Sequence, residues 1–416
     1  MIKFEDAVKI ILENTKTVGL EKVFLDNALG RVLAEDIYAD RDNPPADNSG
    51  MDGFAVRYED IRGATEENPA VLDIIAESKA GGELVKVKPG TAAYIYTGGL
   101  IPEGADTVVQ KELTKVEDNK VFIFQEIKKG SNIRPKGGDY KRGDLLIESG
   151  RKLRPAEIGI LSSVNKPTVY VYQQPRVGIL TTGDEILDVG EPVEKLSQIR
   201  TSNTYSIFSQ VLEAGGIPVV IGFSKDTPED TERKLSYAKS CDILLTTGGV
   251  SVGEYDLVKD FVTKVLGVEI LFWKVKQKPG KPVAFGVWGA EKEKLFFGIP
   301  GNPVAAMVVF ENMVKPAIRK MRGEKKVFNP VIKAKLLGGY RRKKGERLEF
   351  IRVALEMTED GFVARPFGKQ GSNILTGMVF AHGFGMVEVG VTEIKDGEEI
   401  KVIIFDKSFM DGDLNA

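Results

Sequence analysis

The spacing of hydrophobic and polar residues changes several times along the chain. A first set of apolar residues recurs at helical spacing: Phe4, Ala7, Val8, Ile11 and Leu12. This set predicts an amphipathic helix that ends near Asn14, and a second apolar set runs from Leu25 to Leu33. Residues 155–164 return to a helical pattern. We expect this segment to pack with the first helix, which would make the region between them an insertion.

The intervening region has a β-rich pattern. It follows residues 41–50, a loop with paired prolines, Asn, Asp and Gly. Short β-prone runs then alternate with Gly and Pro turns, at residues 92–96, 107–110 and 121–125. This pattern is typical of a small β-rich domain.

Strand and helix patterns alternate from Pro175 to about Gly323. The predicted strands cover residues 177–181, 217–222 and 242–247, and the predicted helices cover residues 204–214 and 227–239. Gly215 and Gly216 should stop the first of these helices, and Thr227 should cap the second. The alternation predicts a parallel, doubly wound sheet with helices on both faces, which binds ligands at the carboxyl ends of its strands.

The C-terminal part is strand-like again, with runs at residues 331–337, 348–357, 362–366 and 400–405. The expected fold class is therefore multidomain α/β plus β, with a central three-layer α/β/α domain. We divide the chain into a discontinuous helical linker-type domain (1–42 and 143–174), an inserted β-rich domain (43–142), the central domain (175–325) and a small C-terminal β domain (326–416).

Composition narrows the chemistry. The 58 basic and 60 acidic side chains give a formal net charge of −2, so no global field favours nucleic acid or anionic membrane. A lone cysteine, Cys241, excludes an intrachain disulfide and a multi-cysteine metal site. Without a signal-peptide pattern or an apolar run of about 18 residues, we expect a cytoplasmic protein with no membrane span. The single histidine, His382, lies in a Gly-containing turn and favours a packing role, which leaves the chemistry to carboxylates, lysines and bound metal.

Two loops that follow predicted strands carry candidate ligand groups. Thr181 to Glu185 ends in two adjacent acids, Asp184 and Glu185. Residues 246–253 are rich in glycine, so their backbone N–H groups could close on an anion at the start of a helix. An ordinary tight turn at Gly248 and Gly249 is the alternative.

Lysines and prolines form two further candidates. Lys274, Lys276 and Lys278 would share one face of a strand, where an anion would relieve their repulsion. A solvated edge strand protected by lysines is the alternative. Residues 298–303 form a stiff loop before a helix, suited to hold a ligand or simply to join strand and helix.

In the β-rich region, Asp52 lies between turn residues, Thr97 precedes two glycines, and Arg134 and Asp139 share one loop. A carboxylate flanked by glycines often only caps a turn. The functional interpretation of Asp52 therefore needs support from elsewhere.

Six strings, in order, resemble the signature strings of molybdopterin molybdenumtransferases, the family of MoeA and gephyrin. They begin at Ser49 (SGMDGFA), Thr97 (TGG), Thr182 (TGDE), Thr247 (TGGVSVG), Lys278 (KPGKP) and Pro300 (PGNPV). Together they extend over nearly the whole chain. One position departs from the family pattern, because Ala305 stands where the family commonly has serine.

The resemblance implies a four-domain homodimer whose active site is built from both subunits. It also implies insertion of molybdate into adenylylated molybdopterin with release of AMP, with Mg²⁺ as cofactor and a molybdopterin adenylyltransferase acting upstream. The central domain would bind molybdopterin. No nucleic acid or membrane partner is expected.

The resemblance also implies roles for individual residues. The catalytic set would be Asp52, Thr97, Asp139 and Glu185, with Asp52 and Asp139 coming from the partner subunit. Mg²⁺ would be bound by Asp184, Glu185 and Asp256. The substrate-binding set would be Arg134, Thr182, Gly183, Asp184, Gly248, Gly249, Val250, Ser251, Asp256, Lys274, Lys278, Pro300, Gly301, Asn302, Pro303, Arg352 and Ser372. Arg134, Lys278 and the Pro300 loop are candidates for molybdate.

Three other functions remain open at this point. A related α/β family adenylylates molybdopterin, but it is one compact domain and leaves Asp52, Thr97 and the C-terminal domain unexplained. A scaffold like gephyrin would carry a further N-terminal domain and a long linker. A tungstate-inserting homologue has the same residue chemistry, since the two oxyanions share charge and nearly share size.

Overall fold

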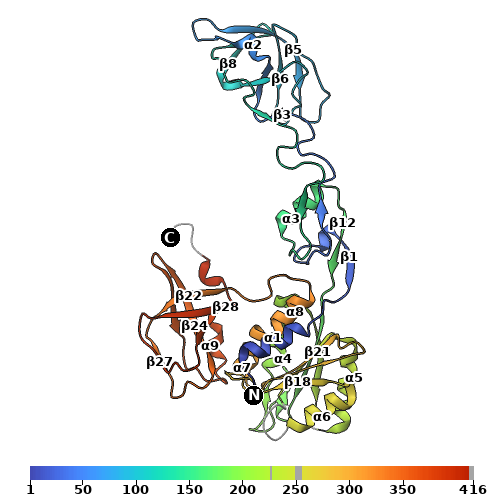
Figure 1. Ribbon diagram of the computed structural model, residues 1–416, viewed down its shortest axis with the longest axis vertical. Helices are drawn as coiled ribbons and strands as arrows, with labels where there is room; N and C mark the ends of the chain where they lie inside the picture. Colours follow the sequence, from blue (N-terminus) through green and yellow to red (C-terminus); the bar gives the residue numbers. More distant parts are fainter. Residues whose placement is uncertain (225–226, 249–254, 412–416) are drawn as a thin grey trace. The chain divides into compact units, whose positions relative to one another are not determined.

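The computed structural model describes residues 1–224, 227–248 and 255–411, with the side chains of residues 228 and 255–260 left aside. The chain forms two compact units, and Figure 1 labels many of their elements. One unit comprises residues 1–35, 150–154 and 168–416, and the other comprises residues 36–149 and 155–167. None of the helices in the described ranges is long and apolar enough to cross a membrane.

A six-stranded sheet forms the centre of the larger unit. Its strands, in spatial order, are β16 (Ile217–Ser224), β13 (Arg176–Thr182), β17 (Ile243–Thr247), β21 (Lys294–Ile299), β20 (Ala284–Trp288) and β18 (Glu269–Trp273). The first four are mutually parallel, as the sequence predicted. The prediction of a wholly parallel sheet is wrong at β20, which is antiparallel to both neighbours. The connections on either side of β20 are too short for a helical crossover, so adjacent strands must reverse direction.

Helices cover both faces of this sheet, which confirms the three-layer arrangement. Ile179 packs into one core with α1 (Phe4–Glu13), α4 (Asn203–Ala214), α7 (Pro303–Val309), a π-helical turn (Phe310–Val314) and α8 (Lys315–Met321). Leu180, the next residue of β13, packs into a second core with α5 (Pro228–Tyr237) and α6 (Tyr255–Leu266). Successive strand residues therefore serve opposite cores.

Several local predictions can be compared with these helices. Gly215 ends α4 in the left-handed conformation (φ +84°), as expected of a helix-stopping glycine. Thr227 does precede α5, but its side chain makes no capping hydrogen bond. The apolar face of α1, for which the sequence suggested packing with residues 155–164, buries Ala7 and Ile11 in the central core.

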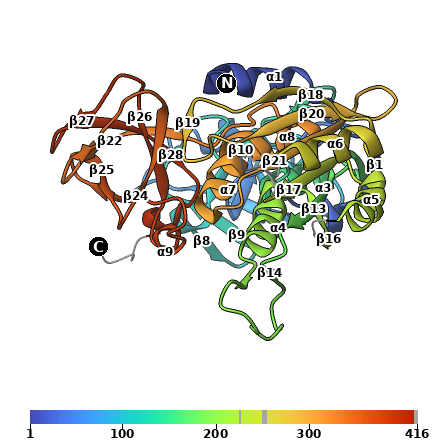
Figure 2. The same ribbon diagram turned by 90° about the horizontal axis from the view of Figure 1, so that it is seen from below.

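The C-terminal strands of this unit close into a barrel, seen beside the central sheet in Figure 2. The strands are β22 (Val331–Leu336), β24 (Leu348–Thr358), β25 (Gly361–Pro366), β26 (Gly383–Val387) and β28 (Glu399–Ile404). Closure occurs because the long β24 pairs with both β25 and β26. His382 precedes β26, and its Nδ1 accepts the backbone N–H of Leu355 (2.9 Å), in keeping with the structural role expected for it.

Short elements complete this unit. They are β1 (Leu20–Phe24) paired with β12 (Thr168–Tyr172), β14 (Ile186–Leu187) with β15 (Ile199–Arg200), β23 (Tyr340–Arg341) with β27 (Glu393–Ile394), β19 (Gln277–Lys278), α9 (Thr376–Val379), and 3₁₀ turns at Leu25–Asn27, Ala238–Ser240 and Ser408–Met410.

The smaller unit is built on a second six-stranded sheet, in keeping with the expected β-rich character. The strand order is β7 (Thr107–Gln110), β4 (Gly53–Val56), β6 (Thr91–Ile95), β5 (Ala70–Ser78), β9 (Lys120–Ile123) and β8 (Thr114–Glu117). Phe54, Leu72 and Val109 lie in its core. The remaining elements are β2 (Ile37–Tyr38) with β11 (Leu145–Ile147), β3 (Asn48–Ser49) with β10 (Ile133–Arg134), α2 (Tyr58–Ile61), α3 (Pro155–Ser163) and a 3₁₀ turn at Lys111–Leu113.

Candidate active site

A cavity of about 550 Å³ lies at the carboxyl ends of β13, β17 and β21. This is the edge at which the sequence predicted a ligand. The ends of these strands and the segments that follow them supply eight of the residues singled out from the sequence: Thr182, Gly183, Glu185, Gly248, Pro300, Gly301, Asn302 and Pro303. Segments more than 100 residues apart in the chain thus line one cavity.

Gly248 lets two of these loops approach each other. Its φ is +85°, and a Cβ at this position would lie only 2.5 Å from the backbone oxygen of Thr182. Any larger residue would push the end of β17 away from the end of β13. The three residues that follow, Gly249, Val250 and Ser251, lie outside the described residues, so their predicted anion contacts stay predictions.

The Pro300 loop is held by a residue that the sequence analysis did not single out. Asn203, at the start of α4, donates from Nδ2 to the backbone oxygen of Gly301 (2.8 Å). Asn203 is 7% exposed and lines the cavity, and its buried Oδ1 has no hydrogen-bond partner in the described part of the chain. An unpaired buried acceptor at a cavity wall is suited to receive a donor from a ligand.

Buried threonine hydroxyls form a connected network beside the same cavity. The Thr204 Oγ1 lies 2.8 Å from that of Thr181 and 2.9 Å from that of Thr201, and Thr247 Oγ1 donates to Thr181 Oγ1 (3.3 Å). The network joins β13, β17 and the start of α4. In the sequence, this network corresponds to the polar residues 201–204, which precede an apolar helix. Such a polar run by itself indicates only that a helix begins there.

The adjacent acids Asp184 and Glu185 are both exposed, but only Glu185 lines the cavity. The third expected magnesium ligand, Asp256, belongs to α6, and its side chain lies outside the described residues. Among the side chains that are described, no group of three or more His, Cys, Asp or Glu is placed to hold a metal ion.

A second cavity of about 600 Å³ adjoins the first, and we call it the oxyanion cavity. The two share Pro282, Pro300, Asn302 and Asn373 in their walls. The oxyanion cavity is also lined by three cations and one hydroxyl: Lys278, Lys281, Arg347 and Ser372. Ala305 lines it as well, so the position that departs from the family pattern presents a methyl group to this cavity.

The expected lysine strand is not continuous. β18 ends at Trp273, Lys274 has a positive φ of +69°, and β19 contains only Gln277 and Lys278. The prediction that three lysines share one strand face is therefore wrong, because the chain leaves the central sheet to pair with β24 of the barrel. Lys278 lines the oxyanion cavity, and Lys274 lines neither cavity.

Arg352 shapes the loop that carries Ser372. Its guanidinium is buried and donates to the backbone oxygens of Gly371 (3.2 Å) and Lys369. Burial lowers the pKa of Arg352. Arg352 lines neither cavity. Ser372 lines the oxyanion cavity, and its backbone oxygen accepts the backbone N–H of Val304 at the start of α7 (3.1 Å).

The smaller unit brings Asp52 and Thr97 together, although they are 45 residues apart. Asp52 Oδ1 accepts hydrogen bonds from the backbone N–H (2.7 Å) and the hydroxyl (2.8 Å) of Thr97. These bonds, the backbone one above all, hold the pKa of Asp52 below its ordinary value. Asp52 is therefore an ionised link between two loops, which differs from the local turn cap that was the alternative.

Arg134 and Asp139 belong to the same unit. Arg134 lies in β10, opposite Asn48 of β3, and Asp139 accepts a hydrogen bond from the side chain of Asn43 (3.0 Å). Arg134 therefore lies beside β3, the strand that precedes the turn containing Asp52.

The fold and these cavities define a class of protein: a multidomain α/β enzyme with a ligand site at the carboxyl edge of its sheet and a cationic cavity beside it. Comparison with known families is more specific. Residues 2–165 match the MoeA N-terminal region (domain I and II), residues 178–320 a probable molybdopterin binding domain, and residues 333–405 the MoeA C-terminal region (domain IV).

Relatives match over nearly the full length. The molybdopterin molybdenumtransferase of Nostoc sp. is 36% identical over 92% of this chain and 88% of its own, and that of Bacillus subtilis is 34% identical over 97% and 94%. A crystal structure of the molybdopterin biosynthesis MoeA protein from Pyrococcus horikoshii superposes with a TM-score of 0.83 at 31% identity, over 97% of this chain and all of that one. The chain belongs to the MoeA family of molybdopterin molybdenumtransferases, which are transferases, and this membership assigns it a role in molybdenum cofactor biosynthesis.

Proposed function

We propose that this protein inserts molybdate into adenylylated molybdopterin and releases AMP. The observation that carries the proposal is the pair of adjoining cavities. The first cavity has backbone groups at the strand ends and the unpaired Asn203 Oδ1, which suit a polar cofactor. The oxyanion cavity has three cations, which suit an oxyanion. Contact through a shared wall would bring the pterin dithiolene and the oxyanion within reach of each other.

Individual residues of the two cavities fit separate tasks. Gly248 and Thr182 offer backbone groups at the end of the sheet, where they would bind the pyrophosphate. Lys278 and Arg347 would neutralise the oxyanion, and the Ser372 hydroxyl would donate to it. The Pro300 loop, held by Asn203, would keep the distance between the two ligands constant.

Magnesium dependence is part of the proposal. Glu185 lines the first cavity and Asp184 precedes it in the chain; both are exposed carboxylates, and hard oxygen donors of this kind suit Mg²⁺. The ion would neutralise phosphate charge there. Asp256 would complete the ligand set.

We also propose that the active enzyme is a cytoplasmic homodimer with a composite site, supplied with substrate by a molybdopterin adenylyltransferase. Asp52, Thr97, Arg134 and Asp139 would come from a second copy of the chain. Light scattering should then give the dimer mass at micromolar concentration. A fully active monomer would contradict the composite site.

The proposed reaction is tested by measuring AMP. Purified protein is incubated with adenylylated molybdopterin and Mg²⁺, with molybdate, tungstate or no oxyanion, and AMP is measured by mass spectrometry. Release that depends on molybdate supports the proposal. Release with tungstate alone would identify a tungstate-inserting enzyme, and no release with either oxyanion would reject an insertase.

A further inference from the structure

A third cavity, of about 340 Å³, adjoins the oxyanion cavity. Its wall contains six basic and two acidic side chains, together with Tyr340: Lys278, Arg341, Arg342, Lys343, Lys344, Arg347, Glu346 and Glu349. We call it the cationic cavity. It lies on the barrel, between β23, the residue 342–347 loop and the start of β24. The six strings that carried the family resemblance contribute only Lys278 to it.

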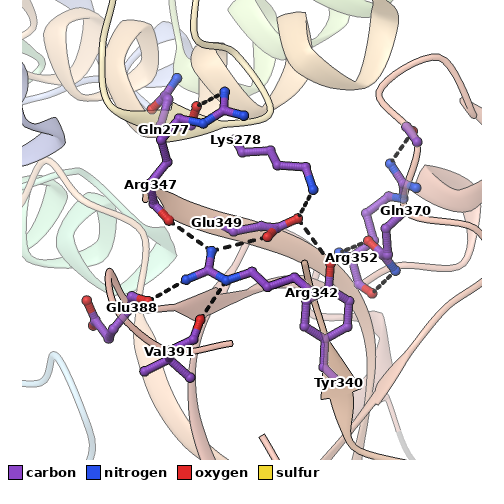
Figure 3. Close-up of polar contacts among 11 residues, drawn as sticks. Gln277, Lys278, Tyr340, Arg342, Arg347, Glu349, Arg352, Gln370, Glu388 and Val391 are labelled. Atoms are coloured by element: carbon purple, nitrogen blue, oxygen red, sulfur yellow. Dashed lines mark hydrogen bonds and ion pairs between the residues drawn. The ribbon is translucent and has the colours of Figure 1, made fainter. Parts of the chain in front are cut away.

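The wall is held by a buried carboxylate. Figure 3 shows Lys278, Arg342 and Tyr340 converging on Glu349. Glu349 is 3% exposed and accepts from Lys278 Nζ (2.7 Å), Arg342 Nη1 (3.1 Å) and the Tyr340 hydroxyl (3.0 Å). The parallel pairing of β19 with β24 sets Lys278 directly opposite Glu349, which explains this contact.

Arg342 belongs to the framework of the cavity. Its side chain is 4% exposed, and its guanidinium also donates to the backbone oxygens of Arg347 (2.8 Å), Val391 (2.7 Å) and Glu388 (2.5 Å). These bonds tie both ends of the residue 342–347 loop to the rest of the barrel. Because the loop is already fixed, binding of an anion to its other cations would not require the loop backbone to lose further conformational entropy.

The remaining charges are unbalanced. Glu349 is shared by Lys278 and Arg342, and Glu346 pairs with Lys344 at 3.8 Å. Within the described ranges, Arg341, Lys343 and Arg347 have no carboxylate within 4.0 Å, and Arg347 donates only to the Gln277 backbone oxygen (3.3 Å). Six cations against two carboxylates leave a local excess of positive charge in a chain whose net charge is −2. A concave cationic surface of this kind attracts small anions.

The cationic cavity and the oxyanion cavity share part of their walls. Lys278, Arg347 and Glu349 line both. An anion that moved from one to the other would therefore stay beside the same ammonium and guanidinium groups. The cavity volume of about 340 Å³ favours a small ligand.

We propose that the cationic cavity is a second anion subsite, which takes a tetrahedral dianion of the molybdate class from solution and shares Lys278 and Arg347 with the oxyanion cavity. Passage of the dianion from this subsite to the oxyanion cavity rests on the proposed function, whereas binding at the subsite itself does not. Arg341 and Lys343 belong to this subsite alone, and Lys281 belongs to the oxyanion cavity alone. The two sites can therefore be weakened separately.

Equilibrium dialysis of the intact protein with molybdate, with metal analysis, counts the sites. Wild type should bind two molybdate ions per chain. Arg341→Gln with Lys343→Gln should remove one, and Lys281→Gln should weaken the other. Lys335→Gln with Lys401→Gln is the matched control, since these exposed lysines of β22 and β28 remove the same charge elsewhere on the barrel.

Kinetics give the second measurement. Arg341→Gln with Lys343→Gln should raise KM for molybdate about fivefold at low salt and leave kcat for AMP release unchanged, because two screened charges are lost outside the reaction cavity. One molybdate per wild-type chain would overturn the subsite, and so would an equal effect in the control. Tighter binding of inorganic phosphate than of molybdate at this subsite would overturn its assignment to the incoming oxyanion. Two bound molybdates without any AMP release would reject the proposed function and retain the subsite.

Discussion

Replacing Glu349 by glutamine tests how the barrel is joined to the β19 segment. The change keeps the size of the side chain and removes its charge. Glu349 is 3% exposed and is bonded to Lys278, Arg342 and Tyr340. Burial, with the neighbouring carboxylate, raises the pKa of Tyr340, so its hydroxyl remains a donor. In the variant, the Arg342 guanidinium would stay buried without an ionic partner.

The expected loss of stability follows from these contacts. Removing one partner of a buried ion pair costs about 3 to 5 kcal/mol. Arg342 retains its three backbone acceptors, so the lower end of this range applies to it. Lys278 is 48% exposed and can turn to water, so its share is about 1 kcal/mol or less. We expect Glu349→Gln to lower the free energy of unfolding by about 3 kcal/mol.

Urea unfolding followed by tryptophan fluorescence measures this loss, because Trp273 and Trp288 both lie in the larger unit. The matched control is Glu346→Gln, which removes an exposed acid from the residue 342–347 loop, three positions before Glu349. It should change stability by less than about 0.5 kcal/mol. Equal unfolding midpoints and slopes for the two variants would refute the structural role assigned to Glu349.

Three other predictions concern the proposed active site. Lys278→Gln should raise KM for molybdate, and the effect should shrink as salt screens the oxyanion charge; a KM unchanged at low salt would show that this lysine does not face the oxyanion. Asp52→Asn and Glu185→Gln should fold normally and bind substrate at least as well as wild type, since each loses a charge that repels a polyanion, while AMP release falls by orders of magnitude; a normal rate in folded Glu185→Gln would contradict a catalytic role. The folded-state pKa of Asp52 is lowered, so its contribution to stability is complete above the unfolded pKa of about 4 and is lost as the pH falls through the lowered value. Thr97→Ala should move that pKa part of the way back, because the backbone N–H remains, and an NMR titration showing no change would remove the hydroxyl from the interaction.

Much of the fold could be predicted from local patterns. The helix at residues 204–214 and its stop at Gly215 depend on neighbours within one or two turns, and the observed α4 differs by one residue at its start. The four parallel strands follow from strand and helix alternation. The glycine and proline loops of the first cavity could be singled out because their residue types restrict the backbone locally.

The tertiary structure alone decided which distant residues meet. Asp52 and Thr97 are joined because β4 and β6 are neighbours in the sheet of the smaller unit. Asn203 reaches Gly301, 98 positions away, because α4 and α7 share one face of the central sheet. Neither pairing leaves a signal in the residues that flank it.

The lysine segment shows the same division most clearly. The alternation of Lys274, Lys276 and Lys278 is what a strand would have, and the sequence by itself determined the charges and the turn residues around them. Which sheet receives the segment depends on pairing with a strand about 70 residues later, and that pairing sets Lys278 against the buried Glu349. A local pattern specifies conformation over a few residues. The strand with which this segment pairs is decided by the packing of whole domains, because only that packing buries Glu349 together with its cationic partners.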